Sequence, residues 1–458
     1  MPAERSLDLA IDVARRVRAE GGRALIIGGW VRDRLLGHDA KDIDLEVFGL
    51  PVERLKTLLA AFGSVNTVGE SFTVFKVGDL DISVPRRESK AGRGHRGFEV
   101  TGDPSMTVAE AARRRDFTIN ALSWDPLTDE YIDPYGGRED LARRVLRAID
   151  ARTFGEDSLR VLRALQFAAR FESTLEPATF ALCQSIPLDD LPAERVWGEV
   201  EKLLLRATRP SIGLALGRDL GVVQRLWPEL AALIDCPQEP EWHPEGDVWI
   251  HTLMVVDEAR PLIEDVDRAR KNTIMLGALL HDVGKPGTTK FEDGRIRSKG
   301  HEAAGVEPAT KMLDRFNVHS MDGFDVRHHV LGIVAYHLAP GSWHKAPTPV
   351  GDGAFRRLAA KVDLELLARV ATADCRGRTG HFDCSATDWF VARARALGVE
   401  HAAPAPLLLG RHLLTLGVAP GPAMGALLKD VYERQLDGEI QSLDEAIDAA
   451  RRLLADGR

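Results

Sequence analysis

Two aspartates, Asp42 and Asp44, stand two residues apart after an apolar segment and a pair of glycines. Residues 42–47 alternate between polar and apolar side chains, which is typical of a strand, so we expect both carboxylates on one face. Two carboxylates on one face can bind Mg²⁺, which takes its other ligands from substrate phosphates. The pair therefore predicts metal-assisted transfer of a nucleotidyl group from a nucleoside triphosphate.

The residues before this pair predict the elements that position it. Residues 24–27 are apolar and predict a buried strand, and Gly28 and Gly29 predict a turn where backbone amides can approach an anion. The amphipathic segment that follows predicts a helix whose N-terminus favours negative charge. An Asp-x-Asp or a Gly-Gly alone is usually an ordinary strand edge or turn, but the order strand, glycine pair, helix and strand is more specific.

The stretch from Gly28 to Asp44 resembles the head of the DNA polymerase beta-like nucleotidyltransferases, in the branch with bacterial CCA-adding enzymes and poly(A) polymerases. This resemblance implies catalytic, Mg²⁺-binding roles for Asp42 and Asp44. It also implies nucleotide binding by Gly28, Gly29 and Arg32. Asp81, in the alternating segment 79–84, is either a third acidic ligand of the metal site or a solvated strand edge.

Residues 113–122 are similar to the second motif of the same family. By this resemblance Arg115, Asp116 and Asn120 contact the triphosphate and the ribose 2′-hydroxyl. The chemistry is consistent with that role, because a guanidinium group matches phosphate oxygens and short Asp and Asn side chains can bond a sugar hydroxyl. The alternative is a basic helix cap without function. Residues 133–137 resemble the third motif and predict a turn before a helix.

Residues 154–164 resemble the segment with which the family selects the incoming base without a nucleic-acid template. The residues concerned are Glu156, Asp157, Arg160 and Arg163, of which Asp157 and Arg160 would face the base. The alternative is an ion pair between Glu156 and Arg160 on a solvated helix face. Residues 192–199 match the neck helix that supports this segment, and an ordinary amphipathic helix explains them nearly as well.

The second half of the chain contains histidines and aspartates in the order H…HD…H…H…D. Such residues on separate helices can converge on a divalent ion, which activates water for attack on phosphoesters. The pattern resembles the HD phosphohydrolase superfamily, which implies His251, His281, Asp282 and Asp374 as core ligands of a transition metal such as Ni²⁺, Mn²⁺ or Co²⁺. By the same resemblance, His301 and His337 would bind a second metal or contact the phosphate. His328, His329 and His344 are alternative candidates for these positions.

Composition agrees with a multidomain enzyme. The chain has 458 residues, 44% of them hydrophobic and 28% charged, which exceeds one ordinary domain. Four scattered cysteines without Cys-x-x-Cys spacing indicate no disulfide framework and a reducing compartment. The N-terminus has no hydrophobic signal core, and no apolar run approaches the ~20 residues that span a membrane, so we expect a cytoplasmic protein.

The formal net charge is −9, but nucleic acid responds to local basic faces. Basic residues flank the expected active site in three clusters: Arg86, Arg87, Lys90, Arg93 and Arg96; Arg113, Arg114 and Arg115; and Arg143, Arg144 and Arg147. Each cluster is either part of an RNA-binding face or ordinary solvated charge.

The motifs and the two resemblances predict an α+β chain. A polymerase beta-like head with a mixed sheet and helices occupies residues 1–140. It is followed by an all-α neck at 141–235, an HD body at 236–400 and C-terminal helices at 401–458, which we expect to contact tRNA. Within the HD body, the Pro/Gly-rich residues 339–353 predict a loop.

The expected activity is template-independent addition of CCA to tRNA 3′ ends from CTP and ATP, with an additional HD-type phosphohydrolase activity. Partners would be tRNA, CTP and ATP, without a membrane or DNA. Alternatives are an enzyme that adds only CC or only A, a poly(A) polymerase, and a phosphohydrolase whose head merely binds RNA. A basic Gly-Arg-Arg-Phe segment typical of the polymerases is missing at residues 72–76, and intact acidic motifs argue against a degenerate head.

Overall fold

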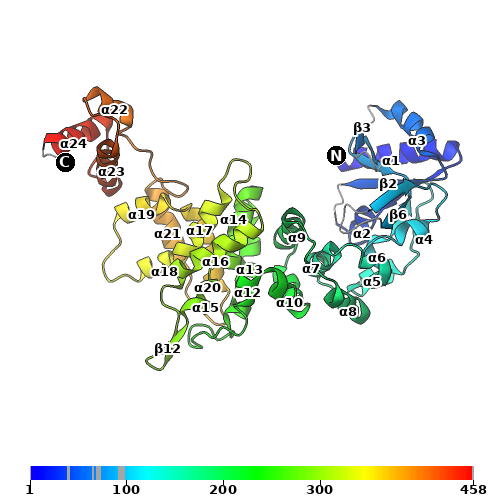
Figure 1. Cartoon of the computed structure of the whole chain (residues 1–458), viewed down its shortest axis with the longest axis horizontal. Coiled ribbons are helices and arrows are strands. Elements are labelled where there is room, and N and C mark those ends of the chain that lie inside the picture. Colours follow the sequence, from blue (N-terminus) through cyan, green and yellow to red (C-terminus); the bar gives the residue numbers. More distant parts are fainter. Residues whose placement is uncertain (1, 39–41, 64–65, 69–73, 91–97, 456–458) are drawn as a thin grey trace. The chain divides into compact units, whose positions relative to one another are not determined.

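The computed structural model describes residues 2–38, 42–63, 66–68, 74–90 and 98–455. The chain divides into two compact units (Figure 1). The first comprises residues 1–203 and 219–221, and the second comprises residues 204–218 and 222–458.

The first unit contains a seven-stranded sheet in the order β3-β4-β5-β2-β1-β8-β9. Strands β2 and β5 are parallel and the other neighbours are antiparallel, so the sheet is mixed, as predicted. The strand bounds are β1 Arg23–Ile27, β2 Ile43–Phe48, β3 Asn66–Val68, β4 Val74–Val77, β5 Leu80–Ser83, β8 Ser123–Asp125 and β9 Glu130–Ile132. A separate antiparallel pair is β6 Arg86–Lys90 with β7 Phe98–Gly102.

The strand alternation gives the large sheet two different faces. Ile26, Leu45 and Val47 are fully buried in a core that also includes side chains of helices α1 (Pro2–Ala19) and α3 (Val52–Leu59). Because neighbouring strand residues point to opposite faces, Asp44 and Glu46 lie on the face away from this core. The predicted helix after the glycine pair is α2 (Gly29–Leu35).

The remaining helices up to residue 231 begin and end as follows: α4 Val108–Ala112, α5 Gly137–Ala142, α6 Ala151–Phe154, α7 Leu159–Phe171, α8 Pro177–Ser185, α9 Ala193–Arg206, α10 Pro210–Asp219, α11 Val222–Leu226 and α12 Pro228–Ala231. Of these, α10 to α12 lie mainly in the second unit. The turn predicted before a helix at residues 133–137 is present, because Asp133 accepts hydrogen bonds from the backbone amides of Gly137 and Arg138 at 2.7 and 3.0 Å. The same part of the chain contains a short parallel pair of strands, β10 (Val145–Leu146) and β11 (Thr174–Leu175).

The second unit is helical apart from one hairpin, β12 (Lys290–Glu292) and β13 (Arg295–Arg297). Its further helices are α13 Val248–Ala259, α14 Arg268–Leu280, α15 Lys285–Thr288, α16 His301–Arg315, α17 Val326–Tyr336, α18 Ala339–His344, α19 Asp352–Ala359, α20 Leu364–Arg376 and α21 Ser385–Ala396. The last helices, α22 Gly410–Thr415, α23 Pro422–Asp437 and α24 Leu443–Ala455, share a hydrophobic core of their own. A mixed sheet followed by helices confirms the predicted fold class.

One loop prediction is wrong. Residues 339–353 were expected to form a loop, yet α18 covers Ala339–His344 and α19 begins at Asp352. Pro340 is in the first turn of α18, where its missing amide hydrogen costs no helix bond. Trp343 then anchors the helix against Phe355 and Phe390, with ring centroids 5.0 and 5.8 Å apart.

The expectation of no disulfide is also wrong. Cys375, in the last turn of α20, is bonded to Cys384, the residue before α21, across a Cα separation of 5.8 Å. The two cysteines are nine residues apart, a spacing that no short motif covers. They meet because the chain turns back between the two helices. Cys183 and Cys236 are buried free thiols.

Within the part of the chain that the structure describes, no helix combines the length and the apolar character needed to cross a membrane.

Candidate functional site

The acidic residues of the head gather on β2 and β5. Asp42 directly precedes β2, Asp44 lies within it, and Asp81 on β5 is the register partner of Asp44. Desolvation by the surrounding protein, and next the nearby carboxylate of Asp81, raise the pKa of Asp44 to about 6. Asp81 also pairs with Lys76 Nζ at 3.2 Å. Crowded carboxylates of this kind fit a divalent cation, which would relieve their mutual repulsion.

A buried glutamate that the motif analysis did not single out organises the nearby arginines. Glu46, 1% exposed, contacts Arg114 Nη2 at 3.2 Å and Arg115 Nη2 at 3.4 Å. Arg115 Nη1 also donates to the backbone oxygen of Asn120 at 2.8 Å. The alternation of β2 places Glu46 on the same face as Asp44, which was the available sequence signal. Arg115 is thereby held close to the acidic residues.

Asp116 and Asn120 belong to a second buried network. Asp116 accepts hydrogen bonds from Asn120 Nδ2 at 2.8 Å and from Arg163 Nε at 2.6 Å. Burial opposes ionisation of Asp116, but Arg163 and Asn120 outweigh it and lower its pKa. Arg32 Nη1 donates to Asn120 Oδ1, and the Arg32 guanidinium stacks over Phe171 at 4.5 Å. Four of the predicted nucleotide-binding residues therefore contact one another in a chain.

The glycine pair forms the predicted turn at the end of β1. Gly28 has φ +68°, a backbone conformation that residues other than glycine rarely adopt. Its amide donates a hydrogen bond to the backbone oxygen of Leu122 at 3.0 Å. Gly29 begins α2.

The segment predicted to select the base, residues 154–164, is only partly helical. Glu156 and Asp157 lie in the turn between α6 and α7, and Arg160 lies in the first turn of α7. The alternative was an ion pair between Glu156 and Arg160 along one helix, but Glu156 lies before α7 begins. The Asp157 carboxylate binds Arg195 of α9 through both oxygens at 3.1 and 2.8 Å. Arg160 Nη1 donates to the Thr153 oxygen at 2.7 Å, and Nη2 donates to the Arg114 oxygen.

Many arginines of the basic clusters are ion-paired within the protein. Arg87 pairs with Asp103 at 2.7 Å, Arg113 with Asp150 at 2.6 Å and Arg147 with Asp140 at 3.1 Å. Arg143 and Arg144 pair with Glu139 and Glu172, both at 3.1 Å. Arg93 and Arg96 are outside the described residues, as is the Lys90 side chain.

In the second unit the histidines and aspartates of the HD pattern converge in two groups. The first group is His251, His281 and Asp374: His251 Nε2 lies 3.1 Å from Asp374 Oδ1 and 3.3 Å from His281 Nε2. The second is Asp282, His301 and His337: Asp282 Oδ1 lies 3.1 Å from His301 Nε2 and 3.7 Å from His337 Nε2. Asp282 Oδ2 faces the first group, 3.2 Å from His281 Nε2. Asp282 therefore bridges the two groups.

The hydrogen bonds behind the imidazole rings set their tautomers. The Nδ1 atoms of His281, His301 and His337 lie 2.8, 2.7 and 3.0 Å from the backbone oxygens of Ala278, Ser298 and Val334. Each Nδ1 therefore donates its hydrogen, and each Nε2 turns a lone pair toward the neighbouring ligand atoms. Such lone pairs repel one another unless a cation lies between them. Imidazole and carboxylate donors suit Zn²⁺-like transition metals better than Mg²⁺.

Glu245 supports this cluster, and the motif analysis did not assign it a role. Its Oε1 lies 2.9 Å from Nδ1 of both His243 and His251, and its Oε2 accepts the Thr379 amide at 3.2 Å. Burial opposes its ionisation, but the bond to His251, together with its other hydrogen bonds, lowers its pKa to about 2. A carboxylate behind a ligating histidine is a common way to orient the ring.

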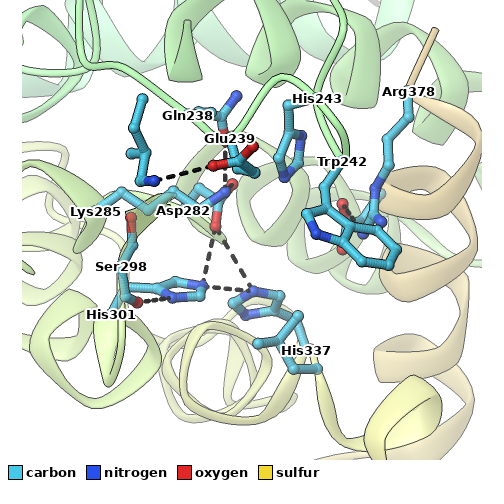
Figure 2. A pocket seen from close by; sticks show the side chains of 13 residues that line it. Gln238, Glu239, Trp242, His243, Asp282, Lys285, Ser298, His301, His337 and Arg378 are labelled. Carbon is cyan, nitrogen blue, oxygen red and sulfur yellow. Dashed lines mark hydrogen bonds and ion pairs between the residues drawn. The ribbon is translucent and has the colours of Figure 1, made fainter. Parts of the chain in front are cut away.

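The cluster opens into a cavity of about 260 Å³ (Figure 2). Lys285 Nζ binds Asp282 Oδ2 and Gln238 Oε1, both at 2.6 Å, and Arg378 Nη2 donates to Asp374 Oδ1 at 3.4 Å. Burial opposes ionisation of Asp282, yet Lys285 and His281 hold its pKa well below its ordinary value. Two carboxylates of the cluster, Asp282 and Asp374, and two cationic side chains, Lys285 and Arg378, therefore line the same cavity.

The alternate histidines lie elsewhere. His329 accepts the Asp363 amide at 3.1 Å and stacks on Phe324 at 4.6 Å, and the neighbouring His328 ring lies 5.0 Å from it. His344 lies at the end of α18, 5.3 Å from the Trp389 ring.

Two protein families match the chain. The poly(A) polymerase head domain matches residues 24–147, and the HD domain matches residues 248–375. The Multifunctional CCA protein of Xanthomonas campestris pv. campestris (strain B100) is 37% identical over 372 residues, which cover 78% of this chain and 85% of that protein. The protein of the same name from Stenotrophomonas maltophilia (strain R551-3) is 40% identical over 303 residues, 64% of this chain and 71% of that protein.

Solved structures share the fold. The CCA-adding enzyme of Bacillus stearothermophilus in complex with CTP aligns over 98% of both chains, with a TM-score of 0.64 and 21% identity. The Thermotoga maritima CCA-adding enzyme complexed with tRNA aligns over 98% of this chain and 96% of that chain, with a TM-score of 0.53 and 18% identity.

Proposed function

Since the chain belongs to the family of CCA-adding tRNA nucleotidyltransferases that carry an HD domain, we propose that it adds CCA to the 3′ end of tRNA from CTP and ATP without a nucleic-acid template. The proposal is supported above all by the position of Asp44 opposite Asp81 on neighbouring strands, beside the partly buried Arg115. Functionally, residues 1–140 would be the nucleotidyltransferase head, 141–235 the neck, 236–400 the HD body and 401–458 the C-terminal segment.

The residues of the head have distinct roles in this proposal. Asp42, Asp44 and Asp81 would hold Mg²⁺, which would supply positive charge to the triphosphate and to the attacking 3′-oxygen. Arg115, fixed by Glu46, binds phosphate oxygens. Asp116 and Asn120, fixed by Arg163 and Arg32, accept and donate hydrogen bonds at the ribose 2′-hydroxyl. Gly28 and Gly29 let the backbone approach the phosphates.

In this proposal, the segment between α6 and α7 selects the incoming base. Asp157 and Arg160 present acceptor and donor groups to the edge of cytosine or adenine, and Glu156 lies beside them. Arg195 holds the Asp157 carboxylate in place from α9. Because tRNA, CTP and ATP meet in the cytoplasm, we place the protein there.

We further propose that the HD site is a phosphohydrolase acting on phosphorylated ribose. This second function is supported by the six converging ligands, His251, His281, Asp282, His301, His337 and Asp374. They would hold a transition metal such as Ni²⁺, Mn²⁺ or Co²⁺, which would supply Lewis acidity toward the phosphoester. Lys285 and Arg378 bring positive charge to the same cavity.

The test of the main proposal is incubation with tRNA lacking its 3′ end and with CTP, ATP or both. Wild-type protein should add CC with CTP alone and CCA with both nucleotides. Asp42→Asn or Asp44→Asn should reduce addition at least a thousandfold while tRNA binding persists, because a neutral amide does not hold the cations. Asp79→Asn, in the turn just before β5, is the matched control and should remain active. Normal addition by either of the first two variants would reject the metal site.

A further inference from the structure

The disulfide between Cys375 and Cys384 is the accessible redox group of the chain. Both cysteines are partly exposed and line a cavity of about 360 Å³, whereas the free thiols of Cys183 and Cys236 are buried. Exchange with another thiol requires a thiolate to reach one of the bonded sulfur atoms. The cavity therefore gives a small reductant access to this disulfide, which closes the segment 376–383.

The closed segment supports two of the candidate metal ligands. Arg378 Nη2 donates to Asp374 Oδ1 at 3.4 Å, and the Thr379 amide donates to Glu245 Oε2 at 3.2 Å. Glu245 Oε1 in turn lies 2.9 Å from His251 Nδ1. One short segment thus fixes a carboxylate on α20 and, through Glu245, an imidazole on α13.

The end of α20 also packs directly on the helix that carries His251. Gly377 follows the last residue of α20, and a Cβ atom there would lie 2.9 Å from the backbone nitrogen of Val255. Because Cβ contacts are not that short, only glycine fits at this position. Val255 lies one turn after His251 on α13. Movement of Gly377 would therefore disturb the helix beside a candidate ligand.

Other contacts hold α20 and α21 together without the disulfide. The hydroxyl oxygens of Thr372 and Thr387 lie 2.9 Å apart, and Thr387 is buried. Phe390 of α21 packs against Trp343 and Phe355, with ring centroids 5.8 and 5.1 Å apart. Cleavage of the disulfide should therefore free the closed segment while the two helices stay packed.

We propose that Cys375 and Cys384 are a redox switch for the HD site. The disulfide holds Arg378 and Thr379 against their partners, and its reduction lets the segment move and weakens the binding of metal by the cluster. The inference rests on the proposed phosphohydrolase function and adds its regulation. In a reducing compartment such as the cytoplasm, where we place the protein, a disulfide is usually transient and serves catalysis or redox sensing. The residues for CCA addition lie in the other compact unit and are independent of the switch.

The switching step is thiol–disulfide exchange with two thiol groups of a cellular reductant. A thiolate of the reductant attacks one of the bonded sulfur atoms, the bond between Cys375 and Cys384 breaks, and a mixed disulfide forms. The second thiol group of the reductant then displaces the protein sulfur, so that the reductant becomes a disulfide. The two electrons and two protons end on the thiols of Cys375 and Cys384. Exchange with an oxidised disulfide reverses the sequence.

The first test measures metal binding in the two redox states of the full-length protein. The protein is reduced with a phosphine, freed of the reductant under nitrogen and titrated with Co²⁺, whose visible absorption reports binding, in excess Mg²⁺ that occupies the head. The dissociation constant for Co²⁺ should be roughly tenfold higher in the reduced protein, the lower end of the effect of losing a support behind a metal ligand. Reoxidation with glutathione disulfide should restore the original value. A chromogenic thiol reagent confirms each redox state.

Two variants serve as matched controls. The double variant Cys375→Ser, Cys384→Ser should bind Co²⁺ like reduced wild type and should respond to neither reagent. Cys183→Ala, which removes a buried cysteine of the first unit, should respond like wild type. CCA addition, measured on the same preparations and expected to be unchanged, reports that each protein is folded.

A second test separates the switch from the hydrolase function. The rate of hydrolysis of bis(p-nitrophenyl) phosphate at subsaturating Co²⁺ should fall roughly tenfold on reduction, in parallel with the loss of affinity. If wild type hydrolyses nothing in either state but its affinity for Co²⁺ still changes, the hydrolase function fails and the switch of metal binding stands. If hydrolysis proceeds and reduction changes neither the affinity nor the rate, the switch is overturned. A double variant that responds to the reductant as wild type does would overturn it as well.

Discussion

At the scale of single residues, the charged side chains of the head mostly position one another. Glu46 holds Arg114 and Arg115, Arg163 holds Asp116, and Arg195 holds Asp157. Each pair joins a residue from a recognised motif to one from another element. Such support fixes a binding group before substrate arrives, which limits the entropy lost on binding.

The support of Asp157 gives a prediction on base choice. Asp157→Ala or Arg160→Ala should relax discrimination among CTP, ATP, UTP and GTP more than it weakens triphosphate binding, because a lost hydrogen bond at the base edge costs specificity there. Arg195→Ala should give a milder form of the same defect. Single-nucleotide incorporation with each triphosphate measures it, with Glu194→Ala on the exposed side of α9 as control. If all three variants keep the wild-type nucleotide preference, Asp157 and Arg160 have a structural role only.

The Asp116–Arg163 pair gives a prediction on stability. Asp116→Asn should lower the free energy of unfolding by about 3 kcal/mol, because it leaves Arg163 without its partner. The pKa of Asp116 is lowered in the folded protein, so its contribution is complete above the unfolded value of about 3.9 and is lost only as the pH falls through the lower folded value.

The difference between Asp116→Asn and wild type should therefore stay constant from pH 5.5 to 8.5. Urea unfolding at several pH values measures this difference. The exposed Asp8→Asn is the control and should unfold like wild type. A difference that varies across this pH range would contradict the assigned ion pair.

At the scale of elements, the joint between α20 and α21 supports the HD cluster. The disulfide between Cys375 and Cys384 closes the segment that carries Arg378 and Thr379. Arg378 contacts the ligand Asp374, and the Thr379 amide binds Glu245, which in turn holds His251. The disulfide thus constrains two supports of the proposed metal ligands at once.

Reduction of this disulfide should loosen the joint without affecting the head. We expect dithiothreitol to lower the stability of the second unit by about 2 kcal/mol and to expose residues 376–383 to proteolysis. CCA addition should be unchanged. Thermal unfolding and limited proteolysis with and without the reductant measure these effects, and the double variant Cys375→Ser, Cys384→Ser should no longer respond to it. Equal responses of wild type and double variant would contradict the prediction.

At the scale of the whole molecule, the two proposed sites belong to different compact units. The acidic residues of the head lie in the first unit, and all six HD ligands lie in the second. Their metal preferences also differ, since carboxylates suit Mg²⁺ and imidazoles suit transition metals.

We therefore expect separate losses of activity. His281→Ala should abolish hydrolysis of phosphorylated ribose and retain CCA addition, and Asp42→Asn should do the reverse. Both activities should be assayed on the same preparations, with His319→Ala, outside the ligand groups, as a control. A chelator followed by Mg²⁺ alone should restore only nucleotide addition. Loss of both activities in His281→Ala with its fold intact would refute independence of the sites.

Local order along the chain was predictable from the sequence alone. The alternation of residues 42–47, the apolar run before Gly28 and the turn at residues 133–137 depend on side-chain periodicity and on glycine and proline, which act over a few residues. The fold class followed from these segments together with the family resemblance. The prediction of a loop at α18 was wrong, because Pro340 lies in the first turn of a helix instead of breaking one. Trp343 packs against aromatic residues of α19 and α21, which the local sequence does not reveal.

Only the tertiary structure decided which distant residues meet. The register of β2 against β5 sets Asp81 opposite Asp44, and the folding of α4 toward the sheet sets Arg115 against Glu46. In the HD body, helix packing divides six ligands into two groups that share Asp282, and the return of the chain after α20 joins Cys375 to Cys384. Such contacts depend on strand register and helix packing between segments far apart in the chain. The spacing of residues along one segment therefore does not predict them.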